Sequence, residues 1–284
     1  MKKIIPFILL TLLFVGCSLK NDKSGEKTIY VTITPLKAII EEITCGDFDV
    51  EVIVPDGQSP ETYDPTIKEL TNVNKSRLVF STGLIDFERS IVNHIDDKAK
   101  VVELHKGIEL IEGCCSHGHH HHGHGTDPHI WTSPKALRKM VENARDVIIA
   151  EFPDKREYVE ATDKLLARID ALDSYCHNTI QHSDVKAVMI YHPAYTYYAR
   201  DYDIEQIAIE HEGKEPSARQ LVSLVDKCRN LGIDVILYQP QYSKDKVTPI
   251  ASEVGARIVE TNPLSGDIIA EIKRVTDIIC GKYE

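Results

Sequence analysis

An alternation of strand and helix patterns occurs twice in this 284-residue chain and constrains its fold more than any other feature. In the first half, apolar runs predict strands at residues 28–33, 50–54, 77–80 and 100–104. In the second half, similar runs predict strands at residues 185–191, 204–209, 234–238 and 256–260. Short strands separated by helices favour parallel sheets covered on both faces. The sequence therefore predicts an α/β fold with two lobes, each a mainly parallel sheet flanked by helices.

A long helical region separates the two halves. Ser133-Pro134 begins one predicted helix, which Phe152-Pro153 interrupts. Asp154 and Glu157 form a capping-box pattern for a second helix that runs to about residue 182. At 1.5 Å per residue this helix would be roughly 40 Å long, which indicates a rigid strut. We therefore expect lobes at residues 28–132 and 184–284, joined by linking helices at residues 133–183.

Helix ends in the second half carry local signals. Ser217 and Gln220 have the spacing of a capping box, and Gly232 and Gly255 fit helix stops.

The first 16 residues have the three parts of an export signal. Lys2 and Lys3 precede an apolar run from Ile4 to Val15, which is too short to span a bilayer because a span needs about 20 residues. The Phe-Val-Gly-Cys ending resembles a bacterial lipobox, in which the cysteine, here Cys17, is lipidated after cleavage. Residues 17–27 are polar and fit a flexible tether. We expect a membrane-anchored lipoprotein outside the cytoplasm, in the periplasm or at the cell surface.

The six other cysteines would then lie in a compartment that permits disulfides. Cys228 and Cys280, both on predicted helices of the second lobe, are the expected pair. The adjacent Cys114-Cys115 offers either soft metal ligands or disulfide partners, and Cys45 and Cys176 are expected to be small buried residues.

A histidine-rich segment at residues 114–125 precedes the linking helices. Imidazole is the commonest side-chain ligand for zinc, copper and nickel, and the absence of apolar residues indicates a loop. We interpret the run as an accessory loop that gathers metal; the alternative is an inert polar loop or an engineered tag. His129, held between Pro128 and Ile130-Trp131, is interpreted as part of the true site. The accessory histidines are His117, His119, His120, His121, His122 and His124.

Four loops that follow predicted strands place potential ligands beside proline or aromatic residues. Ligands bind beyond the carboxyl ends of parallel strands, so a cleft between the two lobes is the expected site. The loops are Pro60–Thr66, Asp127–Trp131, Tyr191–Tyr195 and Thr261–Leu264.

These motifs resemble those of the ZnuA/TroA-like (cluster A-I) solute-binding lipoproteins of zinc and manganese ABC importers. The resemblance runs from about residue 28 to 280 and includes the long helix and the histidine-rich insertion typical of zinc members. It implies a monomeric binding protein, not an enzyme, that captures metal between its lobes and delivers it to a membrane permease with a separate ATPase subunit. The resemblance rests on Tyr63–Thr66, Asp127–Trp131, Tyr191–Tyr195, Glu215–Ser217 and Gln239–Tyr242.

The resemblance also implies four ligand positions, which this chain fills unevenly. His129 and His192 match the second and third positions. Glu61 stands where histidine is usual, and Asn262 stands where members with an acidic ligand have aspartate. Glutamate oxygen binds zinc at about 2.0–2.2 Å, whereas a neutral amide is a poor zinc ligand. We therefore expect Glu61, His129 and His192 as ligands, with water, Asn262 or His211 completing the site.

The expected donor set and the composition bear on the metal and on the class of function. Two imidazoles and one carboxylate favour Zn²⁺, with Mn²⁺ as the alternative because Mn²⁺ prefers more oxygens. A formal net charge of −11 disfavours nucleic acid as a partner. The chain has no GxxxxGK[ST] motif, so ATP would be used by another subunit. The less favoured alternatives are a zinc hydrolase, against which the lack of an HExxH motif argues, and a passive metal buffer or adhesin.

Overall fold

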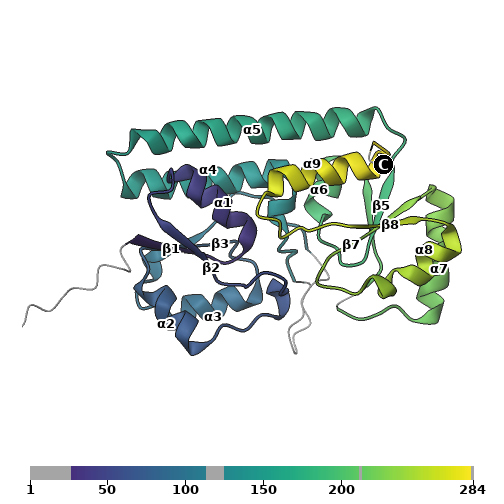
Figure 1. Ribbon diagram of the computed structural model, residues 1–284, viewed down its shortest axis with the longest axis horizontal. Coiled ribbons are helices and arrows are strands. Elements are labelled where there is room, and N and C mark those ends of the chain that lie inside the picture. The colour runs from purple at the N-terminus through teal and green to yellow at the C-terminus, as the bar shows by residue number, and fades with distance from the viewer. Residues whose placement is uncertain (1–26, 113–124, 211–212, 283–284) are drawn as a thin grey trace, which may run out of the picture.

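Two four-stranded parallel sheets carry the fold in the computed structural model, which describes residues 27–112, 125–210 and 213–282 (Figure 1). The strand orders are β2-β1-β3-β4 and β6-β5-β7-β8, so the same order occurs in both sheets. Every strand pair is parallel. The predicted α/β class with two parallel sheets flanked by helices is confirmed.

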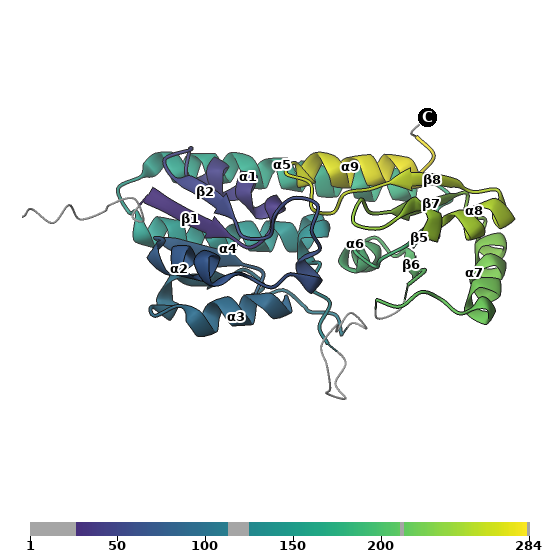
Figure 2. The same ribbon diagram turned by 60° about the horizontal axis from the view of Figure 1, so that its bottom comes forward.

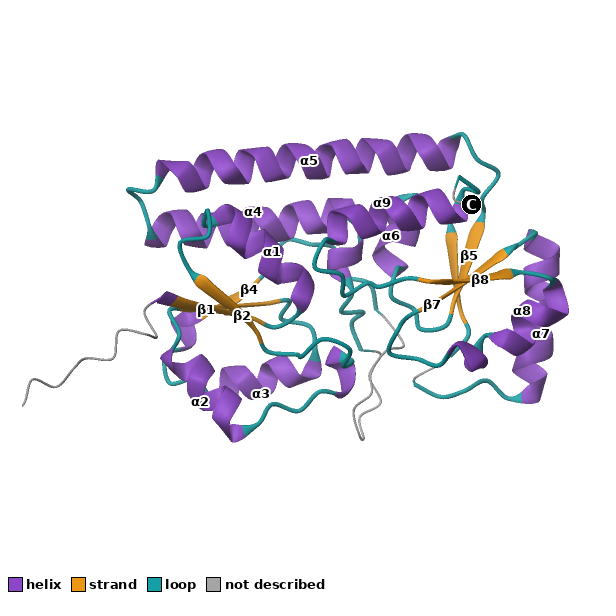
Figure 3. Cartoon of the chain, viewed as in Figure 1, coloured by secondary structure: helices purple, strands orange, loops and turns teal. Residues whose placement is uncertain are grey.

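The first sheet lies between helical layers, with α1 on one side and α2 and α3 on the other (Figures 1 and 3). Its buried central strand β3 consists of Leu78–Ser81, as expected for a strand covered on both faces. The elements are β1 (Thr28–Val31), α1 (Thr34–Ile43), β2 (Asp49–Val52), α2 (Ile67–Lys75), β3 (Leu78–Ser81), α3 (Asp86–His94) and β4 (Val101–Glu103).

The second sheet repeats this arrangement, with α7 and α8 on its outer side (Figure 1). Ser217 and Gln220 form the predicted capping box, and Gly232 and Gly255 end α7 and α8 in the left-handed conformation. The short helix α6 was not predicted. The elements are β5 (Ala187–Ile190), α6 (Thr196–Asp201), β6 (Glu205–Ala208), α7 (Ala218–Leu231), β7 (Val235–Tyr238), α8 (Thr248–Val254), β8 (Arg257–Glu260) and α9 (Ile268–Ile279).

Two antiparallel helices connect the sheets: α4 (Pro134–Glu151) and α5 (Arg156–Gln181). The 26 residues of α5 span about 39 Å, and the helix runs beside α4 and α9 in both views (Figures 1 and 2). The long strut is thus present. Its predicted capping box is wrong, because α5 begins after Lys155 and no side chain caps it.

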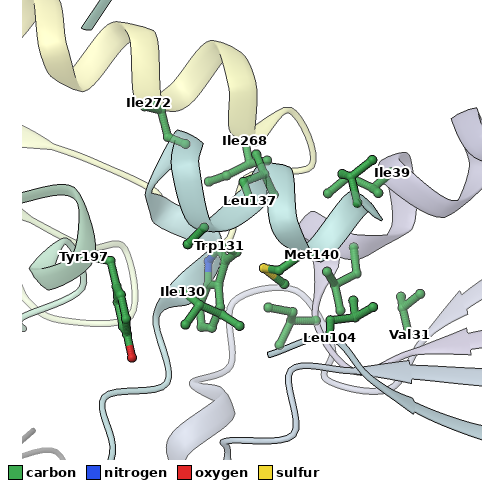
Figure 4. Close-up of a cluster of buried hydrophobic side chains, with 14 of the residues drawn as sticks. Val31, Ile39, Leu104, Ile130, Trp131, Leu137, Met140, Tyr197, Ile268 and Ile272 are labelled. Carbon is green, nitrogen blue, oxygen red and sulfur yellow. The ribbon is translucent and has the colours of Figure 1, made fainter. Parts of the chain in front are cut away.

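One hydrophobic core extends through the first sheet, the linking helices and the inner face of the second sheet. Trp131 lies in this core, and its Nε1 donates a hydrogen bond to the Pro263 carbonyl at 2.7 Å. Figure 4 shows Trp131 beside α4, with Ile268 and Ile272 approaching from α9. This core contains residues on both sides of positions 132 and 183, so it does not divide the chain there. The predicted lobe boundaries at these positions stay predictions.

The predicted pair of Cys228 and Cys280 is not bonded, since both thiols are free. Alternate residues of a strand point to opposite faces of a sheet. Cys228 lies in the core on the outer face of the second sheet, whereas Cys280 packs against the core on the inner face. The sheet therefore separates them. Cys176 is buried as expected, but Cys45 is exposed just after α1, so that expectation was wrong.

Several predictions lie outside the described residues. They concern the signal segment at residues 1–16, the lipidation of Cys17, most of the tether, Cys114-Cys115 and the accessory histidines. Within the part of the chain that the structure describes, no helix combines the length and the apolar character that a membrane crossing requires.

Candidate metal centre

Three side chains that could ligate a metal meet where the two halves of the chain come together: Glu61, His129 and His192. Oε1 of Glu61 lies 3.5 Å from Nε2 of His129 and 3.2 Å from Nε2 of His192. The two Nε2 atoms are 3.3 Å apart. In a tetrahedral zinc site with bonds of about 2.0–2.1 Å, neighbouring ligand atoms are about 3.3–3.4 Å apart. The three atoms therefore have the spacing of one face of such a tetrahedron.

Glu61 reaches this cluster from the loop after β2. It lies in the 3-10 helix Pro60–Thr62, where Pro60 occupies the first turn and is buried. Proline suits that position because its missing N–H is not needed there. The Glu61 side chain is only 8% exposed, so its carboxylate faces the cluster rather than solvent.

His129 is oriented by the nearby Asp127. The Asp127 Oδ1 accepts hydrogen bonds from the backbone N and from Nδ1 of His129, each at 2.9 Å. A carboxylate only accepts, so Nδ1 carries the hydrogen and Nε2 is left to face Glu61. Burial raises the pKa of Asp127, but the nearby His129 and its hydrogen bonds outweigh this effect and hold the pKa below its usual value. Asp127 thus stays ionised.

His192 follows β5 and has an equivalent partner, Glu210, which follows β6. The Glu210 Oε1 accepts a hydrogen bond from Nδ1 of His192 at 2.6 Å, and both residues are 5% exposed. Burial lowers the pKa of His192, but its bonds with Glu210 and Glu61 outweigh this effect and raise the pKa to about 9. Gln239 fixes the backbone on both sides, since its amide accepts from the His192 N and donates to the His192 O. His192 is therefore held in one orientation.

The three donors line a small cavity of about 30 Å³. Its remaining wall is mostly apolar and includes Pro128, Trp131 and Leu264. The Tyr242 ring stacks on the His192 ring, with centroids 5.6 Å apart. A cavity of this size and lining fits one ion with about one water, because a single water needs about 10–15 Å³ of such space.

Asn262, which was also predicted as a ligand, does not line the cavity of the three donors. The Oδ1 of Asn262 accepts a hydrogen bond from the Leu264 N at 3.1 Å, and Asn262 lines a separate cavity of about 520 Å³. Asn262 as a metal ligand stays a prediction, and its hydrogen bond to Leu264 and its place in another cavity do not favour it. His211 lies outside the described residues.

Asp127 and Glu210 were missed as functional residues in the sequence. Asp127 carried a local signal, because aspartate often bonds to the backbone two residues onward. Glu210 ends the run Ile204–Ile209 and so follows a predicted strand, as the expected ligands do. Its partner could not be read from the chain, since 18 residues separate it from His192.

Comparison with known proteins points in the same direction. Residues 29–273 match the model of the family described as "ZnuA: Zinc-uptake complex component A periplasmic". The zinc-binding lipoprotein AdcA of Streptococcus pneumoniae serotype 4 (strain TIGR4) is 28% identical over 279 residues, which cover 93% of this chain but 56% of AdcA. This chain thus spans just over half of that relative. The high-affinity zinc uptake system protein ZnuA of Bacillus subtilis (strain 168) is 29% identical over 263 residues, covering 86% of this chain and 81% of the relative.

Solved structures agree on the fold. A crystal structure of ZnuA superposes with a TM-score of 0.81 at 27% identity and covers 90% of this chain and 98% of its own. The periplasmic zinc-binding protein TroA of Treponema pallidum superposes with a TM-score of 0.78 at 18% identity, covering 91% of this chain and 99% of its own, which supports the fold alone.

Proposed function

Because this chain belongs to the family of periplasmic zinc-uptake complex component A proteins, we propose that it captures Zn²⁺ outside the cytoplasm and delivers it to an ABC importer. The observation that carries the proposal is the triangle of donor atoms from Glu61, His129 and His192, with sides of 3.2, 3.3 and 3.5 Å. Capture and release need no catalytic step, so the protein acts as a binding component.

The donor set supports zinc over manganese. Two imidazole nitrogens and one carboxylate oxygen are typical of a zinc site, whereas Mn²⁺ favours octahedral coordination by six ligands that are mostly oxygen atoms. We propose water as the fourth ligand, because the cavity has room for about one water beside the ion. The relatives AdcA and ZnuA are named for zinc binding and zinc uptake, which agrees with this choice.

The partners and the location follow from the same assignment. We propose that the protein is anchored through lipidated Cys17 and the tether up to residue 27, and that it docks as a monomer on a membrane permease whose ATPase is a separate subunit. A relative named as a lipoprotein supports the anchor. Replacing Cys17 with alanine should release the protein from the membrane fraction, and retention there would contradict the anchor.

Zinc titration of the purified protein tests the function directly. Wild-type protein should bind one zinc tightly in competition with a chelator, and His129→Ala should remove this tight binding. His94→Ala is the matched control, because His94 is an exposed histidine whose Nδ1 bonds to the Ser90 carbonyl of its own helix. Equal zinc affinity in all three proteins would refute the proposed site.

The importer role needs a cellular test. Cells that lack the gene should grow poorly when zinc is chelated, and growth should recover with the wild-type gene but not with His129→Ala. Unchanged growth would favour a passive buffer or adhesin.

A further inference from the structure

Tyr242 lies beside the donor cluster, in the loop that follows β7. Its ring lies over the His192 imidazole at an interplanar angle of 26°, with centroids 5.6 Å apart. It lines the same cavity of about 30 Å³ as Glu61 and His129. Ser59, from the first half of the chain, lines this cavity as well. Tyr242 therefore forms part of a cavity wall to which both halves of the chain contribute.

Hydrogen bonds through Gln239 connect Tyr242 to the proposed ligand His192. The backbone N of Tyr242 donates to the Gln239 O at 3.0 Å, and the Gln239 side chain bonds to both the N and the O of His192. The Tyr191 ring supports it from behind, with centroids 4.8 Å apart, and the Lys246 ammonium lies 6.0 Å from the Tyr242 centroid. The ring is thus fixed relative to His192.

The walls of the cavity limit how many ligands an ion can have. Apart from the donors, the wall has six apolar residues, Tyr242 and three polar residues, Ser59, Gln239 and Gln241. Three protein donors leave three positions open on an octahedral ion, and each would need an oxygen atom. The available 30 Å³ is about enough for an ion and one water. The apolar lining residues are Pro60, Ile85, Pro128, Trp131, Pro263 and Leu264.

Resting on the proposed zinc function, we propose that Tyr242 determines metal specificity by keeping the site four-coordinate. Its ring fills the space that additional water ligands of an octahedral cation such as Mn²⁺ would occupy. Among the wall residues it is suited to this role because it is partly exposed, so its removal would open the cavity to water. Trp131, by contrast, is 1% exposed and bonded to Pro263, and its removal would disturb the core.

The test compares Zn²⁺ and Mn²⁺ affinities of wild type, Tyr242→Ala, Tyr242→Phe and Tyr238→Ala. Tyr242→Ala should reduce the preference for Zn²⁺ over Mn²⁺ at least about tenfold, whereas Tyr242→Phe keeps the ring and should keep the preference. Tyr238→Ala is the control for the loss of a tyrosine from the same region, because Tyr238 bonds to Glu260 and does not line the cavity. Circular dichroism establishes that each variant is folded.

Bound Co²⁺ gives a second readout that a loss of stability would not imitate. Four-coordinate Co²⁺ absorbs visible light strongly, and five- or six-coordinate Co²⁺ absorbs weakly. Wild type and Tyr242→Phe should show the strong bands, and Tyr242→Ala should show weak ones. If Tyr242→Ala keeps both the metal preference and the strong bands, the role of Tyr242 is refuted while the zinc function stands. If wild type binds no zinc, the proposed function itself fails.

If Tyr242→Ala does not fold, Tyr242→Val takes its place, since valine keeps some apolar contact but leaves most of the space of the ring open to water. Weaker visible absorption of bound Co²⁺ together with a lower preference for Zn²⁺ over Mn²⁺ would support the proposal. An unchanged absorption and an unchanged preference would overturn it.

Discussion

Nε2 of His129 lies 3.3 Å from Nε2 of His192, although 63 residues separate the two histidines along the chain. Each ring is held from its far side by a carboxylate, Asp127 for His129 and Glu210 for His192. Such bonds fix the ring orientation and raise the basicity of the ligand nitrogen. The two imidazoles are therefore prepared for a shared ion before it binds.

Replacing Glu61 with another residue that can ligate zinc should preserve zinc binding, whereas replacing it with alanine should not. Glu61→Ala removes one donor and a negative charge, so zinc affinity should fall at least about 100-fold, or about 2.8 kcal/mol. Glu61→His restores the residue that the family resemblance leads us to expect there, and it should retain tight binding. Competition with a chelator measures both. Glu51→Ala, at an exposed position of β2, should behave as wild type, and a loss there equal to that of Glu61→Ala would contradict the assignment.

Glu210 should act through His192 without touching the metal. Glu210→Gln keeps a hydrogen-bonding side chain but removes the charge behind the imidazole, and loss of such an outer partner typically costs about 10–100-fold in metal affinity. The control is Glu205→Gln on β6, where an exposed glutamate pairs with Lys227. Calorimetric titration with zinc checks the difference, and equal affinities for the two variants would show that Glu210 has no such role.

Zinc affinity should decrease as the pH falls. The pKa of His192 in the metal-free protein is raised to about 9, so near pH 7 zinc must displace a proton from it. Affinity should change about tenfold per pH unit between pH 6 and 8 and level off above pH 9, since one proton is released. Titration in buffers of different ionisation enthalpy measures that proton, and release of none would contradict the prediction.

The same raised pKa affects the stability of the metal-free protein, with the opposite dependence on pH. A group whose pKa is higher in the folded state contributes stability that is fully present below its unfolded value of 6.5. This contribution should be lost as the pH rises through about 9. Urea unfolding of metal-free protein across this range measures it, with His192→Ala as the comparison.

Deletion of residues 117–124 should separate the two kinds of metal binding. The glycine spacing of these histidines predicts weak extra sites, whereas the proposed tight site consists of Glu61, His129 and His192. The deletion should remove the weak equivalents and leave one tight zinc. Calorimetry reports both stoichiometry and affinity, and loss of the tight site would show that the run supplies a ligand.

Much of the fold was predictable because its signals are local. The Ser217 capping box and the Gly232 and Gly255 stops each depend on only a few neighbouring residues. The errors concern longer-range effects. The helix α6 contains Tyr197 and Tyr198, whose side chains favour strands but are buried against other elements. The predicted disulfide between Cys228 and Cys280 was wrong, because the sequence of a helix does not show which face of a sheet that helix covers.

The sequence alone predicted two parallel sheets flanked by helices and a long connecting helix, and the family resemblance implied Glu61, His129 and His192 among five candidate ligands. Hydrophobic periodicity and turn residues report on neighbours in the chain, so they define elements. Only the tertiary structure decided that Glu61, His129 and His192 approach within 3.2–3.5 Å. It also decided that Glu210 holds His192 and that Asn262 faces a different cavity. Such distances depend on how two sheets pack around one core, and small shifts of a strand end would place a carboxylate in or out of the site.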